Sequence, residues 1–199
     1  MHAVLELDDA PIIQYTSISS PLGTLWMAMG QHGLTRVGFG VDGAQFYADL
    51  QRDGSGAPEY LPNGLPEATD QFERYFAGEL RRFDLPLDFG AATPFRRKVL
   101  QAVAAVPFGT VRSYRDIAVA VGAPAAMRAV GSTMAGNRLA IIVPCHRIIR
   151  SDGRLGEYAL HSLGPSGVDH KTLLLRHEGV TLRDGRVITG DHPNHPHLL

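Results

Sequence analysis

The stretch TPFRRKVLQAVAAVPFGTVRSYRDIAVAVGAP, residues 93–124, predicts two helices joined by a tight turn. Thr93-Pro94 is an N-cap followed by proline at the first helical position. Apolar residues then recur at helical spacing until Pro107-Phe108-Gly109 ends the pattern. These apolar residues are Val99, Leu100, Val103 and Val106. Ser113 caps a second, shorter helix, which Gly122-Ala123-Pro124 closes. With the helix expected to follow from about Ala125, this gives two short helices joined by a turn that contains glycine, which resembles a helix-turn-helix.

A third helix is expected from about Ala125 to Met134, and its composition is unusual. The helix consists mostly of Ala, Gly and Ser, with one long cation, Arg128. A helix that reads base edges in the major groove carries several long polar side chains instead. Small side chains suit a shallow entry into a minor groove, with Arg128 as the single intruding group. The alternative is a helix buried against its neighbours, where Ala and Gly serve packing. Composition alone leaves both readings open.

The remaining sequence divides into a β-rich part and a helical part. Residues 12–40 contain short apolar runs separated by Ser-Pro-Leu-Gly and Gln-His-Gly, a pattern typical of strands joined by tight turns. We expect loop or weak helix over 42–64, a helix over about 67–78, and a strand followed by a linker over 81–94. The domain boundary falls in that linker. A last helix is expected over about 167–178, before Gly179.

The composition is that of a soluble globular protein with one or two domains. The chain has 199 residues and is 44% hydrophobic, which is enough to bury a core. No segment approaches the run of about 18 apolar residues that a membrane span needs, and we expect no secretory signal at the N-terminus. The single cysteine excludes an internal disulfide framework and a cysteine-cluster zinc site. It favours a reducing, cytosolic setting.

The formal net charge of −1 hides an asymmetry along the chain. Residues 93–178 contain 12 Lys and Arg against 5 Asp and Glu, a balance of +7. The rest of the chain contains 7 against 15, a balance of −8. Such a division suggests that one half faces a polyanion. Scattered, solvated charge is the alternative.

The only cysteine, Cys145, lies in the run AIIVPCHRII. A lone cysteine in an apolar run is commonly a small buried hydrophobe. A thiol reacts as the thiolate, however, and an adjacent histidine can take its proton. Because successive residues of a strand point to opposite faces, Cys145 and His146 can cooperate only if the backbone turns, and Pro144 favours such a turn. Asn137 could tie this loop to the backbone, and Glu178 could orient His146 in a Cys-His-Glu relay.

Four motifs resemble the O6-alkylguanine-DNA alkyltransferase family, the methylated-DNA–protein-cysteine methyltransferases. They are VPCHRII, RAVGSTMAGN, PFGTVRSYRDIA and HEG. The resemblance is strong from Thr93 to Gly179 and weaker over SSPLGTLWMAMGQHGLTRVGF. It implies an α/β (α+β) protein with a ribonuclease-H-like sheet domain over residues 1–90. A helical, winged helix-turn-helix-like domain over residues 91–180 would carry the cysteine, and residues 181–199 are expected to form a flexible tail.

The resemblance implies a direct, in-line, single-turnover transfer. The Cys145 thiolate would attack the alkyl carbon on O6 of a guanine and form a stable S-alkylcysteine. His146 would act as the base through a water, with Glu178 orienting it and Asn137 bracing the loop. Tyr114 would donate a proton or a hydrogen bond to guanine N3. No metal or organic cofactor is implied.

The resemblance also implies that the target base leaves the duplex, with Arg128 filling the gap. The other residues expected to bind DNA are Ala125, Ala126, Met127, Ala129, Gly131, Ser132, Ser113 and Arg115. The expected substrate pocket consists of Val143, Pro144, Arg147, Ile148, Gly156, Tyr158 and Ala159. The implied partner is double-stranded DNA with O6-alkylguanine lesions, without any membrane association. A cytoplasmic monomer is expected, and cooperative binding to DNA is left open.

The sequence departs from the family pattern at two places. The loop GRLGEYALHSLGPSGVDHKTLLLRHEG is several residues longer than usual and lacks a glycine pair. It keeps Tyr158 and has Ala159 where a main-chain N–H contacts O6, so the pocket could be narrower or wider than usual. Met127 is bulkier than the small residues expected beside Arg128, and the sequence does not say whether it faces DNA or the core.

Three other functions fit parts of the sequence. A non-catalytic sensor of alkylated DNA would use the same DNA-binding surface, but relatives of that type replace the cysteine. A transcriptional regulator would use the helix-turn-helix, but the third helix has few groups that read bases. A cysteine hydrolase would use the Cys-His-Glu relay, but the sequence contains no evident oxyanion device.

Overall fold

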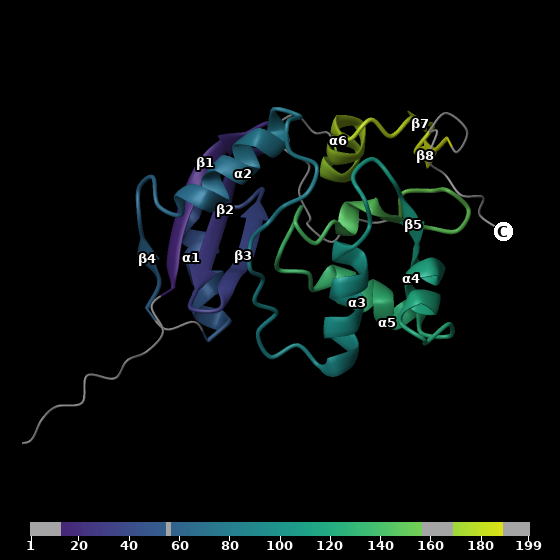
Figure 1. The fold of residues 1–199 in the computed structure, drawn as a ribbon, viewed down its shortest axis with the longest axis horizontal. Helices are drawn as coiled ribbons and strands as arrows, with labels where there is room; N and C mark the ends of the chain where they lie inside the picture. The colour runs from purple at the N-terminus through teal and green to yellow at the C-terminus, as the bar shows by residue number, and fades with distance from the viewer. Residues whose placement is uncertain (1–12, 55–56, 157–168, 189–199) are drawn as a thin grey trace, which may run out of the picture.

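The N-terminal part is built on a four-stranded sheet. The computed structural model describes residues 13–54, 57–156 and 169–188 (Figure 1). Strands β1 (Gln14–Ser20), β2 (Gly23–Gly30) and β3 (Gly33–Phe39) are consecutive and antiparallel. A short strand, β4 (Glu59–Tyr60), pairs parallel with β1, so the order is β3-β2-β1-β4. The strands expected within residues 12–40 are confirmed.

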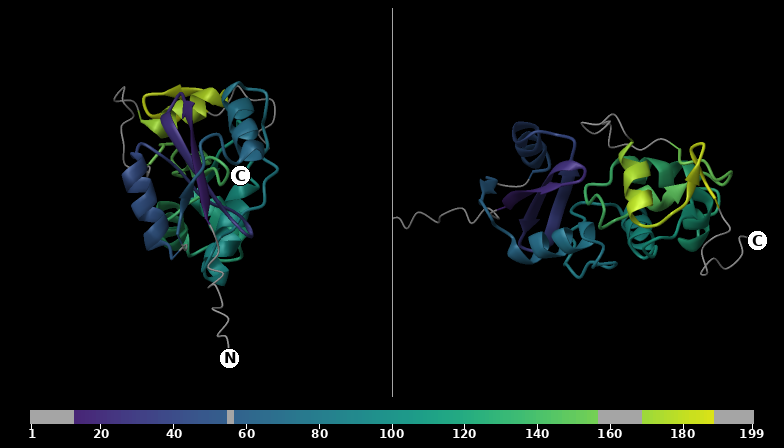
Figure 2. Two further views of the ribbon diagram at one scale, coloured as in Figure 1. Left: turned by 90° about the vertical axis from the view of Figure 1, so that its left-hand side faces the viewer. Right: turned by 90° about the horizontal axis from the view of Figure 1, so that it is seen from above.

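Two helices cover opposite faces of this sheet (Figure 2). Along β2, Trp26 and Ala28 alternate with Leu25 and Met27, as the two-residue period of a strand requires. Helix α1 (Gly43–Arg52) packs onto the face of Trp26 and Ala28 with its residues Phe46 and Leu50. Helix α2 (Pro66–Phe76) packs onto the face of Leu25 and Met27 with Phe72 and Tyr75. Each face therefore has its own apolar layer.

Two expectations for this part need correction. Residues 43–52, expected as loop or weak helix, form the regular helix α1 with Asp42 as its N-cap. The spacing of Phe46 and Leu50, four residues apart behind an aspartate, was the signal for it. The strand expected within 81–94 is absent from those residues, which make a single bridge, Leu34↔Leu87. Pro86 has no N–H to donate, so the ladder cannot extend there.

The C-terminal part contains four helices, among them those of the predicted helix-turn-helix. They are α3 (Pro94–Ala104), α4 (Tyr114–Ala120), α5 (Met127–Ala135) and α6 (His170–His177). Strand β5 (Arg112–Ser113) pairs parallel with β6 (Ile148–Ile149). Both predicted caps are confirmed. Thr93 accepts a hydrogen bond from the Arg96 N–H, and Ser113 and Asp116 form a reciprocal capping box.

The expectation of a flexible tail over 181–199 is wrong for residues 182–187. Strands β7 (Leu182–Arg183) and β8 (Arg186–Val187) form a hairpin. Its turn, Asp184-Gly185, has both residues at positive φ, and Asp-Gly is a strong hairpin signal that was available in the sequence. The hairpin packs Leu182 and Val187 onto an apolar cluster with Leu155 and Leu175. The expectation for the rest of the tail lies outside the described residues.

One apolar core joins the two parts. Leu25, Met27 and Phe72 of the sheet part belong to the same buried cluster as Val99 and Val103 of α3. Cys145 belongs to this cluster as well. The sheet domain is thus packed against the helices that surround the cysteine. Among the described residues, no helix combines the length and the apolar composition needed to cross a membrane.

The capping box predicts a measurable contribution to stability. We expect Ser113→Ala to lower the free energy of unfolding by about 1 kcal/mol, because the Asp116 N–H loses its acceptor at the start of α4. Urea unfolding followed by circular dichroism measures this change. Ser132→Ala, on the exposed side of α5, is the control and should change it by less than about 0.5 kcal/mol. Equal effects of the two substitutions would contradict the role of the cap.

Candidate active site

The backbone around Cys145 leaves strand geometry through a series of tight turns. The Ile142 N–H donates to the Ala140 carbonyl across Ile141, whose φ is 72°, so this is a γ-turn with a strained β-branched residue at its centre. The Cys145 N–H donates to the Val143 carbonyl across Pro144, whose φ of −80° and ψ of 66° define an inverse γ-turn. One turn of 3-10 helix, η1 (Cys145–Arg147), follows. The turn predicted from Pro144 is confirmed.

The carboxylate of Glu178 lies at the centre of the site. Glu178 is the C-cap of α6 and is 3% exposed. Its oxygens accept five hydrogen bonds. The donors are Tyr75 Oη at 2.8 Å, the Gly109 N–H at 3.2 Å, His146 Nε2 at 2.8 Å, and Arg147 Nε and Nη2 at 2.8 Å each. The predicted contact between His146 and Glu178 is present.

These contacts decide the charge of Glu178. Burial by itself raises the pKa of the carboxyl group, because it disfavours the charged form. The hydrogen bonds and positive charges of His146 and Arg147 outweigh this effect, and the pKa of Glu178 lies well below its usual value. Burial, and after it the Glu178 carboxylate, hold the pKa of the Tyr75 hydroxyl far above its ordinary value, so Tyr75 stays a donor. Glu178 is therefore ionised throughout the physiological range.

The protonation of His146 follows from that of Glu178. His146 is fully buried, and burial lowers its pKa although the carboxylate of Glu178 acts in the opposite direction. The imidazole is thus neutral, and an ionised carboxylate can only accept, so the proton sits on Nε2. Nδ1 carries the lone pair, is buried, and has no hydrogen-bond partner among the residues that the structure describes. This arrangement leaves a free base at Nδ1.

Asn137 braces the cysteine loop from the end of α5. Its Nδ2 donates to the Val143 carbonyl at 2.8 Å and to the Cys145 sulfur at 3.2 Å, and its Oδ1 accepts from the Leu139 N–H at 3.0 Å. The predicted bond to the backbone of the loop is present. A hydrogen bond to sulfur favours the thiolate over the thiol.

Lys171 is a buried cation that the sequence did not single out. Its ammonium group donates to the Ile148 and Leu155 carbonyls at 2.6 Å each. Burial lowers the pKa of Lys171 to about 8, and the charge of Cys145 acts in the opposite direction. The two groups therefore interact electrostatically, which favours the thiolate.

Two of the residues that contact Glu178 were not predicted to do so. Arg147 was expected to line the substrate pocket, but its guanidinium group is buried against Glu178. Tyr75 lies in the helix expected over about 67–78, and its hydroxyl reaches Glu178 from the sheet domain. A buried tyrosine hydroxyl requires a partner, and that was the available signal. The partner itself was not readable from the sequence.

The remaining predicted catalytic and pocket residues differ in their exposure. Val143, Pro144 and Ile148 are buried, Gly156 is exposed, and Tyr114 is half-buried against the cluster that contains Cys145. Tyr158 and Ala159 lie outside the described residues. Within residues 13–54, 57–156 and 169–188, no three His, Cys, Asp or Glu side chains form a group that could hold a metal ion.

The predicted DNA-binding residues all lie at or near the surface. Ala125, Met127, Arg128, Ala129, Ser132 and Arg115 are exposed, and Ala126, Gly131 and Ser113 are half-buried. On α5, Val130, Thr133 and Met134 point into the core, so the opposite side of the helix presents the small residues and Arg128. Met127 is 46% exposed and does not face the core.

The fold and the site together define a class. This is a two-domain protein in which a helix-turn-helix domain carries a buried cysteine beside a His-Glu pair, and a sheet domain supports it. The model of the 6-O-methylguanine DNA methyltransferase DNA binding domain matches residues 94–180, and that of the ribonuclease-like domain of the same family matches residues 13–89. The chain belongs to the 6-O-methylguanine DNA methyltransferase family.

Relatives with similar sequences and structures span most of the chain. The constitutive methylated-DNA–protein-cysteine methyltransferase of Bacillus subtilis is 38% identical over 85% of this chain and 98% of its own. That of Methanosarcina barkeri is 39% identical over 85% of this chain and 99% of its own. A crystal structure of Mycobacterium tuberculosis OGT in complex with DNA has a TM-score of 0.69 and 36% identity, and covers 83% of this chain and 92% of its own.

The lowered pKa of Glu178 predicts a pH-dependent contribution to stability. We expect Glu178→Gln to lower the free energy of unfolding at pH 7 by about 3–5 kcal/mol, because it leaves Arg147 buried without its counter-charge. The unfolded carboxyl group titrates near 4.5, so the difference should shrink as the pH falls below 4.5 toward the folded-state pKa. Thermal unfolding of both proteins between pH 7 and pH 3 measures it (a range of about four units).

The control for this measurement is Glu73→Gln on the exposed side of α2. It should change the free energy of unfolding by less than about 0.5 kcal/mol at every pH. A difference between Glu178→Gln and the parent protein that stays constant down to the acid limit would contradict an ionised Glu178.

Proposed function

We propose that this protein repairs DNA by transferring the alkyl group from O6-alkylguanine directly and irreversibly to Cys145. The observation that carries the proposal is the position of the single cysteine. Cys145 stands on a sharp turn, with Asn137 donating to its sulfur and a neutral histidine next in the chain. A helix-turn-helix in the same domain supplies the surface for DNA. The names of the relatives support the same reaction.

The reaction is a displacement at carbon. The sulfur of the Cys145 thiolate forms a bond to the alkyl carbon while the bond between that carbon and guanine O6 breaks. The electron pair of the broken bond stays on O6 of the base, which takes up a proton and remains in the DNA as guanine. Because a thioether is stable, the product cannot return to the active thiol, and each molecule reacts once.

The buried pair of His146 and Glu178 accepts and stabilises the proton of the thiol. His146 Nδ1 takes the thiol proton through a water, and the Glu178 carboxylate stabilises the imidazolium that forms, as the acid does in other triads. Lys171 and Asn137 stabilise the thiolate. Tyr114 supplies a proton or a hydrogen bond to N3 of the departing base. None of these steps needs a cofactor.

We expect DNA to bind to the exposed side of α5. The basic balance of residues 93–178 suits contacts with phosphates, so affinity should be largely independent of sequence and should fall as salt rises. Small side chains allow α5 to approach a minor groove, and Arg128 fills the gap left by the extruded base. Because Met127 is exposed beside Arg128, it takes part in this contact.

The setting of the reaction follows from its chemistry. We infer that the protein works as a monomer on double-stranded DNA with O6-alkylguanine lesions, in the cytoplasm. A reducing compartment keeps the one thiol available, since oxidation would end its activity before it met a lesion.

The proposal predicts a covalent change at one residue. Incubation with a duplex that contains one O6-methylguanine should raise the mass of the intact protein by about 14 Da, once per molecule. Cys145→Ser should show no gain, because the hydroxyl is a much weaker nucleophile at neutral pH. Intact-protein mass spectrometry measures the gain, and peptide mapping locates it. Tight binding to the lesion without any gain in mass would favour a sensor of alkylated DNA, and repeated turnover would refute self-alkylation.

Arg128 should matter only when the base has to be extruded. We expect Arg128→Ala to slow methyl transfer from duplex DNA by about tenfold or more, because the cost of unstacking is no longer offset. Transfer from the free base O6-methylguanine should change by less than about twofold. Rate constants from quenched reactions measure both. Arg81→Ala, which removes a cation of the sheet domain outside this surface, is the control. Equal losses on the two substrates would contradict the role.

A further inference from the structure

The segment that carries Asn137 is fixed to the sheet domain by its backbone. The Val37 N–H of strand β3 donates to the Arg138 carbonyl at 2.7 Å, and Val37 forms a parallel bridge with Leu139. Strand β3 is the edge of the sheet on this side, so the sheet continues for one bridge into the other domain. The residue after Asn137 is therefore part of the contact between the domains.

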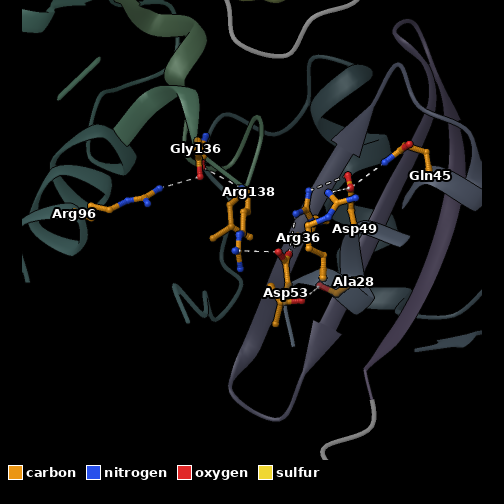
Figure 3. A network of polar contacts seen from close by, with 12 residues as sticks. Ala28, Arg36, Gln45, Asp49, Asp53, Arg96, Gly136 and Arg138 are labelled. Atoms are coloured by element: carbon orange, nitrogen blue, oxygen red, sulfur yellow. Dashed lines mark hydrogen bonds and ion pairs between the residues drawn. The ribbon is translucent and has the colours of Figure 1, made fainter. Parts of the chain in front are cut away.

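An ion-pair network holds the side chain of Arg138, the residue after Asn137 (Figure 3). Arg138 Nη2 lies 2.9 Å from Asp53 Oδ1, and Asp53 is the C-cap of helix α1. The other oxygen of Asp53 accepts from Arg36 Nη2 at 2.8 Å and from Nε at 3.1 Å. Arg36 also lies 3.5 Å from Asp49. Each carboxylate oxygen of Asp53 thus binds one arginine, and only one of these arginines belongs to the domain of the thiol.

Neighbouring residues of this segment face opposite directions. Asn137 points inward, is 8% exposed, and donates to the Cys145 sulfur and the Val143 carbonyl. Arg138 points outward to Asp53. Because Arg138 follows Asn137 directly in the chain and its carbonyl accepts from the Val37 N–H, we expect a displacement of the Arg138 backbone to move Asn137 relative to the sulfur.

A cavity adjoins the outer side of this segment, while Leu139 packs into the apolar core. The cavity has a volume of about 370 Å³ and is lined by residues of both domains, including Asp53, Asn137 and Arg138. Polar contacts cross its walls. Besides Asp53–Arg138, they include the bond from Arg96 Nη2 to the Gly136 carbonyl at 3.2 Å (Figure 3). The position of Asn137 therefore depends on a few identifiable polar groups.

We propose that Asp53 of the sheet domain is a positioning residue for the transfer reaction, holding Asn137 against the Cys145 sulfur through Arg138. The proposal rests on the alkyl transfer proposed above. It gives the sheet domain a part in the chemistry, because the Asn137 hydrogen bond stabilises the thiolate that attacks the alkyl carbon.

The sign of the effect separates positioning from simple electrostatics. Removing the negative charge of Asp53 should, by charge alone, stabilise a nearby thiolate and favour DNA binding. Loss of positioning has the opposite effect, since Asn137 drifts from the sulfur. A slower reaction after Asp53→Asn thus cannot result from the change in charge.

The test compares Asp53→Asn with Asp49→Asn. Both residues bind Arg36, but only Asp53 reaches Arg138, so Asp49→Asn is a matched control. We expect Asp53→Asn to slow methyl transfer from an O6-methylguanine duplex by about threefold to tenfold, and Asp49→Asn by less than about twofold. As Cys145 is the only thiol, iodoacetamide reports its reactivity without DNA. The pH midpoint of that reaction should rise for Asp53→Asn alone.

A double-mutant cycle completes the test. Arg138→Gln should slow transfer as Asp53→Asn does, and the double variant should be no slower than either, because both break one contact. Arg138 is half-exposed, so Arg138→Gln serves if Asp53→Asn does not fold.

Two outcomes would overturn the proposal. One is an unchanged rate of methyl transfer and an unchanged pH midpoint of the iodoacetamide reaction in a folded Asp53→Asn or Arg138→Gln variant. The other is equal slowing of methyl transfer by Asp49→Asn. If the parent protein transfers no methyl group, the proposed function fails, and the iodoacetamide midpoints still decide the coupling.

Discussion

The buried carboxylate of Glu178 is the interaction on which the rest of the arrangement depends. A charge removed from water is tolerated only when it is paired and fully hydrogen-bonded. Here the donors come from helix α2, from the turn after α3 and from η1, while Glu178 itself ends α6. Satisfying one carboxylate therefore joins four segments from both domains. The same bonds set the orientation and the tautomer of His146.

The sheet domain reaches the cysteine loop from two directions. Tyr75 contacts Glu178 behind His146, and Val37 contacts Arg138 beside Asn137. The shared apolar core sets the distance between the domains, and these polar contacts set the finer position. The reactive loop contains a strained residue, Ile141, and two γ-turns, so it needs support from its surroundings to keep its shape.

Features that depend on neighbours in sequence were predicted well. The caps at Thr93 and Ser113, the strands of residues 12–40 and the turn at Pro144 follow from local stereochemistry. Family motifs added the pairing of His146 with Glu178. Two of the errors were also local, since helix α1 and the hairpin at Asp184-Gly185 had signals in the sequence. The third error, the strand expected within 81–94, depends on where Pro86 meets the sheet.

The amino-acid sequence was enough to predict the domain types, the candidate nucleophile Cys145 and the basic half of the chain. Which groups surround the thiol depends on how the segments pack. Tyr75 lies 103 residues from Glu178, and Asp53 approaches Arg138 across the contact between two domains. The physical reason is that a buried charge accepts any donor that the packing brings within reach. Periodicity and caps specify each segment, but the partners of Glu178 and Arg138 are fixed only when the segments pack together.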